Sequence, residues 1–180
     1  MLSLKKNIKL INFYPPYIGA GISLKSVNED FTKISVQLKM RWYNRNAVGT
    51  HFGGSLYSMC DPFYMFILME NLGKDYIVWD KAASIKFIKA ESKPVTSTFE
   101  ISKDRIAEIK KYVDENGKGN FTFHTTVNNE TGDLIAEVEK VVYVRSKMFN
   151  KIQSGTHTQQ SSHLHTLSII LLLPTYPICL

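Results

Sequence analysis

The twenty residues GGSLYSMCDPFYMFILMENL, at positions 53–72, decide the fold of this chain. Over residues 55–72, apolar side chains fall on nearly every side of a helix instead of forming one stripe. A helix of this kind in a globular protein must be enclosed on most of its surface. The run is too short, and too interrupted by Asp61-Pro62 and Glu70, to cross a bilayer, which takes about 20 apolar residues. It is therefore predicted to be one long buried helix, and Asp-Pro leaves open a kink or a division into two helices.

The rest of the body alternates between apolar and polar residues, the period-of-two pattern of strands that bury one face. Strands are predicted over residues 31–42, 83–87, 95–101, 120–128 and 134–147. Residues 129–133 have the composition of a hairpin loop, and a slip of phase near residues 139–141 predicts a β-bulge in the last strand. One amphipathic helix is predicted over residues 104–115.

An antiparallel sheet that curls around one buried helix accounts for both patterns. The predicted fold class is therefore α+β, a hotdog fold in which a curved sheet of five to six strands wraps around one long buried helix. An N-terminal helix or arm is expected over residues 1–18, followed by the hotdog domain over residues 19–148. Residues 149–180 are predicted to form an appended tail of low order that contributes nothing to the functional prediction.

Composition and charge narrow the class of protein and of partner. With 180 residues, 44% of them hydrophobic and 21% charged, the chain fits one domain with a packed core. The excess of 22 basic over 16 acidic residues favours anionic small molecules, but it is spread along the chain, so nucleic acid is not expected as a partner. Cys60 and Cys179 stand far apart, which predicts a reducing, cytoplasmic location, and neither a metal site nor a cofactor is expected. Lysines interrupt the first apolar stretch, so no signal peptide is expected, and the apolar run at residues 169–173 is too short for a membrane span.

The start of the predicted buried helix carries the first candidate catalytic groups. Gly53 and Gly54 open the helix, where the first N–H groups have no partner within the helix and the helix dipole adds positive charge. Such N–H groups can stabilise the oxyanion that forms during acyl transfer, although two glycines could equally serve only a tight turn. His51, just before them, could orient a substrate, donate to its carbonyl group or act as a base, or could be an ordinary loop residue.

Asp61 is the second candidate. A carboxylate in an apolar helix is costly unless it is hydrogen-bonded or faces a cavity, so it could be a general base or a nucleophile. The alternative is that Asp61 caps a second helix with Pro62 at its first position. Eight residues, about 12 Å along a helix, separate Gly53 from Asp61. If both act on one carbonyl group, the site must combine two subunits, which predicts a homodimer or a dimer of dimers.

Further residues in the loop, along the apolar segment and beyond it are predicted to bind substrate. The predicted substrate-binding residues are Asn44, Asn46, Gly49, Thr50, Phe52, Tyr57, Phe63, Tyr64 and Trp79. Asn44 and Asn46 could also hold the loop through bonds from side chain to backbone.

At these residues the chain resembles the hotdog-fold acyl-CoA thioesterases, in particular the branch that includes phenylacetyl-CoA thioesterase. That branch carries an Asn, a Gly a few residues later, His-Gly-Gly, and an acidic residue seven positions after the second Gly. The matching positions here are Asn44 or Asn46, Gly49, Gly53, Gly54 and Asp61. The longer string GTHFGGSLYSMCDPFY, at positions 49–64, followed by VWDK at 78–81, is similar to a thioesterase-like bacterial family of unassigned activity.

The resemblance implies hydrolysis of an acyl-CoA or another acyl thioester, with Gly54 as the oxyanion contact and Asp61 of the neighbouring subunit as the catalytic carboxylate. Two departures accompany it. Phe52 stands where the thioesterases usually have His, so that His51 is displaced by one position, and Pro62 directly follows the acid. The Phe52 departure favours one alternative, a non-catalytic binder of acyl chains or acyl thioesters. A hydratase or dehydratase of acyl thioesters is the other alternative.

Overall fold

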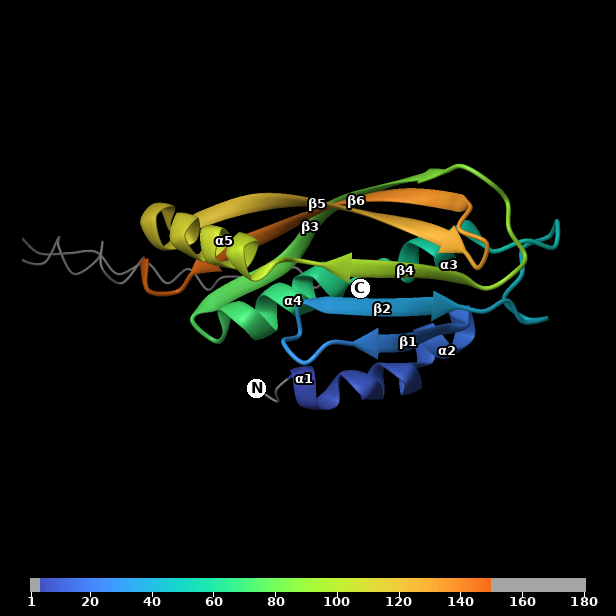
Figure 1. Cartoon of the computed structure of the whole chain (residues 1–180), viewed down its shortest axis with the longest axis horizontal. Helices are drawn as coiled ribbons and strands as arrows, with labels where there is room; N and C mark the ends of the chain where they lie inside the picture. Colours follow the sequence, from blue (N-terminus) through green and yellow to red (C-terminus); the bar gives the residue numbers. More distant parts are fainter. Residues whose placement is uncertain (1–3, 150–180) are drawn as a thin grey trace, which may run out of the picture.

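A single antiparallel sheet organises the protein, whose computed structural model describes residues 4–149. Its six strands lie in the order β1-β2-β4-β5-β6-β3, so β1 and β3 are the two edges (Figure 1). The strands are β1 (Ile22–Val27), β2 (Lys33–Leu38), β3 (Tyr76–Phe87), β4 (Val95–Glu100), β5 (Lys118–Asn129) and β6 (Leu134–Ser146). The predicted α+β hotdog class is confirmed, and the predicted hairpin between β5 and β6 is present.

The apolar segment that decides the fold forms two helices. They are α3 (Gly53–Ser58) and α4 (Phe63–Leu72), divided at Asp61-Pro62, whose peptide bond is cis. This is the two-helix alternative that the Asp-Pro pattern left open. Helix α4 packs against β3, β4 and β6, and both Phe63 and Ile67 are completely buried. Because the sheet curls around this helix, apolar residues are needed on nearly all of its sides.

The remaining helices cover the edge and one end of the sheet. They are α1 (Leu4–Asn7), the 3-10 helix η1 (Ile8–Phe13), α2 (Pro15–Ala20) and α5 (Lys103–Asn116). The three N-terminal helices lie along β1 (Figure 1), with Ile8 buried and the Leu4 N–H donating to Glu70 Oε2 at 2.9 Å. Helix α5 buries Ile106, Ile109 and Val113. The predicted tail lies almost wholly outside the described residues, at 150–180.

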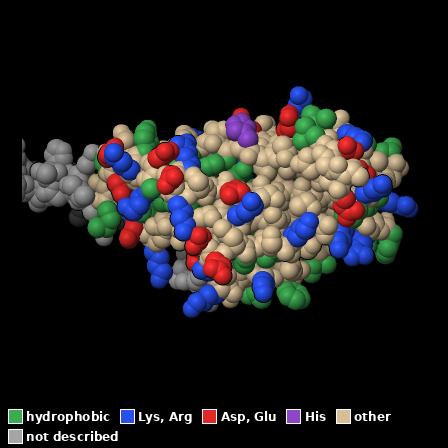
Figure 2. Space-filling view, in the orientation of Figure 1, with side chains coloured by type: hydrophobic (Ala, Val, Ile, Leu, Met, Phe, Trp, Pro, Cys, Tyr) green, Lys and Arg blue, Asp and Glu red, His purple; other side chains and the backbone are tan. Residues whose placement is uncertain are grey.

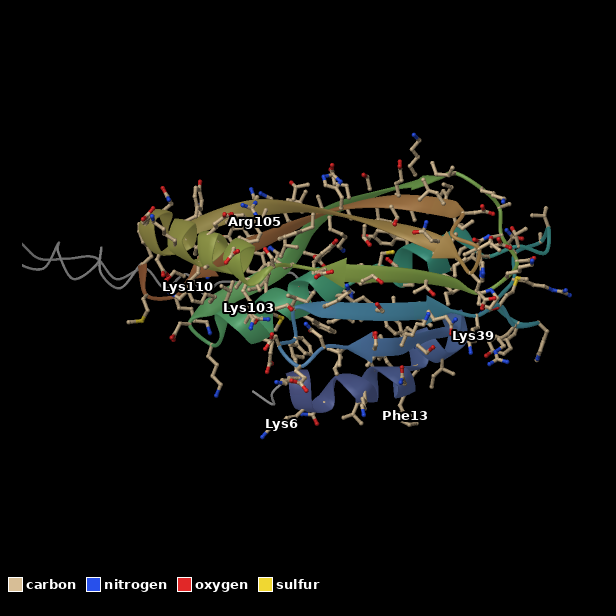
Figure 3. All side chains as sticks on the ribbon, viewed as in Figure 1. Lys6, Phe13, Lys39, Lys103, Arg105 and Lys110 are labelled. Carbon is tan, nitrogen blue, oxygen red and sulfur yellow. The ribbon has the colours of Figure 1, made fainter. Side chains whose placement is uncertain are left out.

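The polar sides of these helices face outward. Figure 3 shows Lys103, Arg105 and Lys110 projecting from α5, and Lys6 and Phe13 projecting from the N-terminal helices. On the face shown in Figure 2, basic and acidic side chains are interspersed instead of forming a patch of one sign. Among the described residues, no helix is long and apolar enough to span a membrane. Within residues 4–149, His, Cys, Asp and Glu side chains also form no cluster that could hold a metal ion.

The predicted β-bulge in β6 is wrong, and its correction leads to the site. From Ala136 to Ser146 the β6 residues that face the core alternate without a slip, and Lys140 occupies one of these inward positions; the register of β6 shifts at its start, where Ile135 and Ala136 are adjacent and both buried. The irregularity lies instead on β3, where Asp80 and Ala82 pair with the adjacent residues Val142 and Val141. The apolar pattern is interrupted at position 140 because the inward side chain is a lysine with acidic partners. The alternation of inward and outward residues continues through it.

Candidate active site

The most polar feature of the interior is a cluster of Asp61, Lys140 and Asp80. Lys140 Nζ lies 2.5 Å from Asp61 Oδ1 and 3.1 Å from Asp80 Oδ2. The three residues come from the turn between α3 and α4, from β6 and from β3. Lys140 Nζ also lies 5.6 Å from the centre of the Tyr57 ring, within range of a cation–π contact. The fold therefore brings one ammonium group and two carboxylates together from three separate elements.

Lys140 is held in its charged form although only 1% of its side chain is exposed. Burial disfavours the ammonium group, but the hydrogen bond and charge of Asp61, together with those of Asp80, outweigh it and raise the pKa of Lys140 above its ordinary value. A buried charge whose partner is removed is strongly destabilising. Loss of both acids would therefore leave Lys140 as an uncompensated buried charge.

The two carboxylates differ in their surroundings. Burial raises the pKa of Asp80 to about 6; the charge of Lys140 opposes this shift and Asp61 adds to it. Only 19% of the Asp80 side chain is exposed, and its Oδ1 has no hydrogen-bond partner within the described part of the chain. The Asp61 side chain is 47% exposed, so it reaches solvent while Lys140 holds one of its oxygens. Asp61 is thus the accessible acid and Asp80 the enclosed one.

Helix capping does not account for Asp61. The N-cap residue of α4 is Pro62, and no side chain caps this helix. The Asp61 backbone carbonyl accepts a hydrogen bond from the Tyr17 hydroxyl of α2, while its carboxylate points to Lys140. Burial, and secondarily the Asp61 charge, raise the pKa of Tyr17 well above its ordinary value, so its hydroxyl stays protonated and donates.

A largely apolar cavity of about 570 Å³ has Asp61 among its lining residues. It lies between the N-terminal helices and the beginning of α4. Its lining residues are Leu10, Ile11, Tyr14, Tyr17, Asp61, Pro62, Met65 and Phe66. A carboxylate beside an apolar cavity suits a substrate with a reactive polar group attached to an apolar chain.

The other end of α3 is built from neutral groups. In the loop before it, Asn46 Oδ1 accepts from the N–H groups of Val48 and Thr50 at 3.0 and 2.9 Å. Asn46 Nδ2 donates to Thr50 Oγ1 at 2.8 Å, and Gly49 supplies the left-handed conformation, φ 83°, that the turn requires. The predicted role of Asn46 in holding the loop is confirmed by these bonds.

Asn44 is also occupied by the backbone. Its Nδ2 donates to the carbonyl oxygens of Ala20 and Lys39 at 2.8 and 3.0 Å, and its Oδ1 accepts from the Arg41 N–H at 2.6 Å. The side chain is buried. These bonds confirm its expected part in holding the loop, and they leave its amide no free group for a substrate.

His51 is a buried, oriented residue and not a solvated loop side chain. It is 5% exposed, and its Nε2 lies 2.8 Å from the carbonyl oxygen of Lys93. Because a carbonyl oxygen only accepts, Nε2 carries the proton, and Nδ1 of the neutral ring is an acceptor. Nδ1 has no hydrogen-bond partner among residues 4–149.

Gly53 and Gly54 lie at the N-terminus of α3, next to aromatic rings. In the described residues, neither N–H donates a hydrogen bond to another protein group. A Cβ on Gly53 would lie 3.0 Å from the Phe87 ring, and one on Gly54 would lie 2.4 Å from the Phe52 ring. Gly53, His51 and Asn46 belong to the lining of a second cavity, of about 300 Å³, which shares no residue with the cavity at Asp61.

The structure gives the remaining predicted substrate-binding residues different surroundings. Tyr57 lies at the ion cluster. Phe63 and Tyr64 are buried in the core, where the Tyr64 hydroxyl donates to the His124 carbonyl oxygen at 2.6 Å. Trp79 stacks on Tyr143 with ring centres 4.6 Å apart, on the face of the sheet opposite its neighbour Asp80. Of these residues, Tyr57 is the one whose ring contacts the ion cluster in the described part of the chain, through Lys140.

Lys140 and Asp80 were missed as site residues by sequence reasoning. The signal was present: Lys140 stands where the alternation of β6 requires an inward residue, and a buried lysine needs an acidic partner. The buried Cys60 is no alternative nucleophile, because burial raises the pKa of its thiol to about 12.

Comparisons with known proteins identify the family of the chain and proteins of similar fold. The family model of a domain of unknown function, DUF4442, matches residues 7–144. The chain belongs to the DUF4442 family. This is a thioesterase-like family of unknown activity. No functionally curated protein matches the chain in sequence.

Solved structures similar to this DUF4442 protein show the same fold. A probable thioesterase of unknown function from Pseudomonas aeruginosa has a TM-score of 0.70 at 14% identity, covering 81% of this chain and 97% of the other. A thioesterase from Haemophilus influenzae has a TM-score of 0.59 at 10% identity, covering 79% and 91%. A mutant of a thioesterase from Staphylococcus aureus has a TM-score of 0.54 at 14% identity, covering 72% and 98%. The DUF4442 chain thus shares its hotdog fold with these solved structures.

Proposed function

We propose that this DUF4442 protein hydrolyses an acyl thioester, such as an acyl-CoA, with Asp61 as the catalytic carboxylate. One observation carries the proposal: a half-exposed carboxylate, held by a buried lysine, stands beside an apolar cavity of about 570 Å³. The cavity suits an acyl chain, and the carboxylate suits activation of water at the thioester group. A cytoplasmic location goes with the proposal, because Cys60 is a free thiol and persists most easily in a reducing compartment.

In the proposed reaction the carbonyl oxygen of the thioester accepts hydrogen bonds from the N–H groups at Gly53 and Gly54. Asp61 takes a proton from water while the oxygen of that water adds to the carbonyl carbon. Collapse of the tetrahedral intermediate breaks the carbon–sulfur bond, and the proton passes to the departing thiol. Direct attack by Asp61, followed by hydrolysis of the anhydride, is the nucleophilic form of the same proposal.

A homodimer is part of the proposal because the two halves of this machinery lie at opposite ends of α3. A helix of six residues is about 9 Å long, too long for both ends to reach one carbonyl group. The edge strand β3 offers a way to join two copies: within residues 4–149, this strand of 12 residues pairs with β6 on one side and with no strand on the other. Exposed Trp79, Phe87 and Ile88 accompany this edge. Strand addition across β3 would cover it in a twofold dimer.

Basic side chains close to the loop are proposed to meet the phosphates of CoA. Arg41, Arg45 and Lys81 are exposed, and Lys89 lines the cavity beside His51. Lys89 is also paired with Asp133 at 2.7 Å, so a phosphate group would compete with this carboxylate.

The experiment is a screen of acyl-CoA esters, from acetyl to palmitoyl and including phenylacetyl, for release of free thiol. We expect the wild-type protein to release thiol from at least one ester and Asp61→Asn to lose at least about 1,000-fold in kcat. Asp30→Asn, which removes an exposed carboxylate paired with Lys103, is the matched control and should keep full activity. No release from any ester, or an Asp61→Asn variant of wild-type activity, would refute the proposal.

The placement of Phe52 supports a second candidate, a protein that binds acyl thioesters without cleaving them. The Phe52 ring lies against Gly54, 2.4 Å from where a Cβ of that residue would be, so it crowds the start of α3. Binding of an acyl-CoA without thiol release by the wild type, together with release by Phe52→Ala, would favour this second function.

A further inference from the structure

The proposed reaction gives no chemical step to the buried Lys140 or to Asp80. We propose that Lys140 and Asp80 are positioning residues for Asp61: Lys140 fixes one oxygen of the Asp61 carboxylate and places a positive charge beside it, and Asp80 shares that charge. This inference rests on the proposed function, because it concerns the same carboxylate.

The contacts give Lys140 an orienting geometry. Its Nζ lies 2.5 Å from Oδ1 of Asp61, while in the described part of the chain no donor is paired with Oδ2. One oxygen is therefore anchored and the other is left to take a proton from water. Tyr17 holds the backbone of the same residue through the Asp61 carbonyl oxygen. Side chain and main chain of Asp61 are thus fixed from two different elements, β6 and α2.

The enclosure of Lys140 argues for an effect on charge as well as on geometry. With 1% of its side chain exposed, the ammonium group acts through a medium of low polarity, where its attraction for a carboxylate is stronger than at the surface. The groups that face it are Asp61 from the turn after α3, Asp80 from β3 and the Tyr57 ring from α3. Cys60 and Tyr17, the other titratable groups close to Asp61, stay protonated at neutral pH.

Asp80 shares the positive charge of Lys140 with Asp61. One ammonium group faces two carboxylates, so the cluster carries a net negative charge when both are ionised. Asp80 Oδ1 has no partner in the described residues, and Asp80 is the more enclosed of the two acids. Removing the lysine leaves two carboxylates side by side, which disfavours the ionised form of Asp61. Removing the Asp80 charge leaves Lys140 to Asp61 alone, which favours it.

These opposite effects give a test that a purely structural role would not pass. The pH dependence of kcat/KM is measured for the wild type, Lys140→Met and Asp80→Asn. The acid limb is the part of that profile where kcat/KM falls as the pH is lowered. For Lys140→Met we expect the acid limb to move up by about one pH unit and kcat to fall about 30-fold. For Asp80→Asn we expect the limb to move down by about half a unit, with kcat changed less than about fivefold. Lys140→Arg should return the limb toward the wild-type position, because it restores a cation.

Matched controls separate this effect from loss of any charged strand residue. Lys33→Met removes a strand lysine that pairs with Glu100 at 2.9 Å on the surface, and Asp30→Asn removes an exposed acid. Both should leave the acid limb in place. Limbs that stay at the wild-type pH in Lys140→Met and Asp80→Asn, or that move in the same direction in both, overturn the inference.

A second readout separates this inference from the proposed function. ¹³C NMR of labelled aspartate carboxyl groups follows the titration of Asp61 directly, with or without catalysis. If the wild type cleaves no thioester, the proposed function fails. Opposite shifts of the Asp61 titration in Lys140→Met and Asp80→Asn would still support the inference that Lys140 positions Asp61. Unchanged titration overturns it. Should Lys140→Met not fold, Asp80→Asn and Lys140→Arg carry the same comparison.

Discussion

The two ends of helix α3 are built in opposite ways. Just after its C-terminal end, Asp61 and Asp80 share the buried ammonium group of Lys140, and Asp61 lines an apolar cavity. At its start, the loop is held by neutral hydrogen bonds, through Asn46 and His51, and the first N–H groups of the helix are left without an acceptor in the described part of the chain. Charge suits proton transfer, whereas unpaired N–H groups suit a developing oxyanion. The difference indicates two half-sites, each equipped for one part of a reaction.

The two ends should also respond differently to substitution. Breaking a buried ion pair costs about 3–5 kcal/mol, whereas removing one partner of a neutral hydrogen bond costs about 1–3 kcal/mol. Changes at the end with Asp61 are therefore expected to act on turnover and on pH dependence. Changes at the loop are expected to act on substrate binding and on local order.

The largest effect on this contrast between the two ends of α3 is expected in kcat/KM when the cavity beside Asp61 is filled. Met65→Trp adds a bulky ring to its wall, so long acyl chains should lose about 100-fold in kcat/KM while acetyl-CoA changes less than about threefold. Rates of thiol release for a series of chain lengths measure this. Equal losses for short and long chains would mean that the cavity does not hold the acyl group.

A smaller effect is expected in the stability of Asp80→Asn. The pKa of Asp80 is about 6 in the folded protein against an ordinary value of 3.8, so the folded state binds more protons in this window and loses stability as pH rises through it. Two pKa units correspond to about 3 kcal/mol. The gain in unfolding free energy of Asp80→Asn over wild type should therefore grow by about 2–3 kcal/mol between pH 4 and pH 7.

Chemical denaturation at the two pH values measures this gain. Asp30→Asn, at a surface ion pair, is the control and should show no such growth. A gain that stays constant or shrinks with rising pH would show that Asp80 is not the strained member of the cluster.

The smallest effect is expected at the loop. His51→Phe keeps the volume of the side chain but leaves the Lys93 carbonyl oxygen without its donor, so unfolding free energy should fall by about 1–2 kcal/mol. We expect KM to rise about fivefold and kcat to change less than about twofold, because His51 holds the loop and does not transfer a proton. Steady-state kinetics and denaturation measure both. A large fall in kcat with unchanged KM would place His51 in the chemistry instead.

Much of this fold can be predicted from local patterns. The alternation of β2, the stripe of α5 and the all-round apolar character of α4 each reflect one buried surface, which a short stretch of sequence reveals. Strand β1 was not predicted, because it buries only Ile22 and shows little alternation. Asp61 was found because a carboxylate inside an apolar helix is unusual.

The ion cluster could not be predicted in the same way. In the sequence, Lys140 looks like a break in the alternation of apolar and polar residues. Its partner Asp61 stands 79 residues before it. A one-dimensional pattern shows that position 140 faces inward, but it does not show which acid the sheet and the helix turn bring to it. Pairings of this kind depend on the register of three elements at once.

Complementation between two inactive chains tests the central claim most directly. One chain carries Asp61→Asn and keeps the N–H groups at Gly54. The other carries Gly54→Val, which keeps the N–H but crowds the approach to it, and keeps Asp61; its new side chain meets the exposed Phe52 ring, which can move away. Each homodimer should lose at least about 100-fold in thiol release, and the purified mixed dimer, with one complete site, should regain about half of the wild-type rate. A mixed dimer as inactive as both parents would contradict a site shared between two chains.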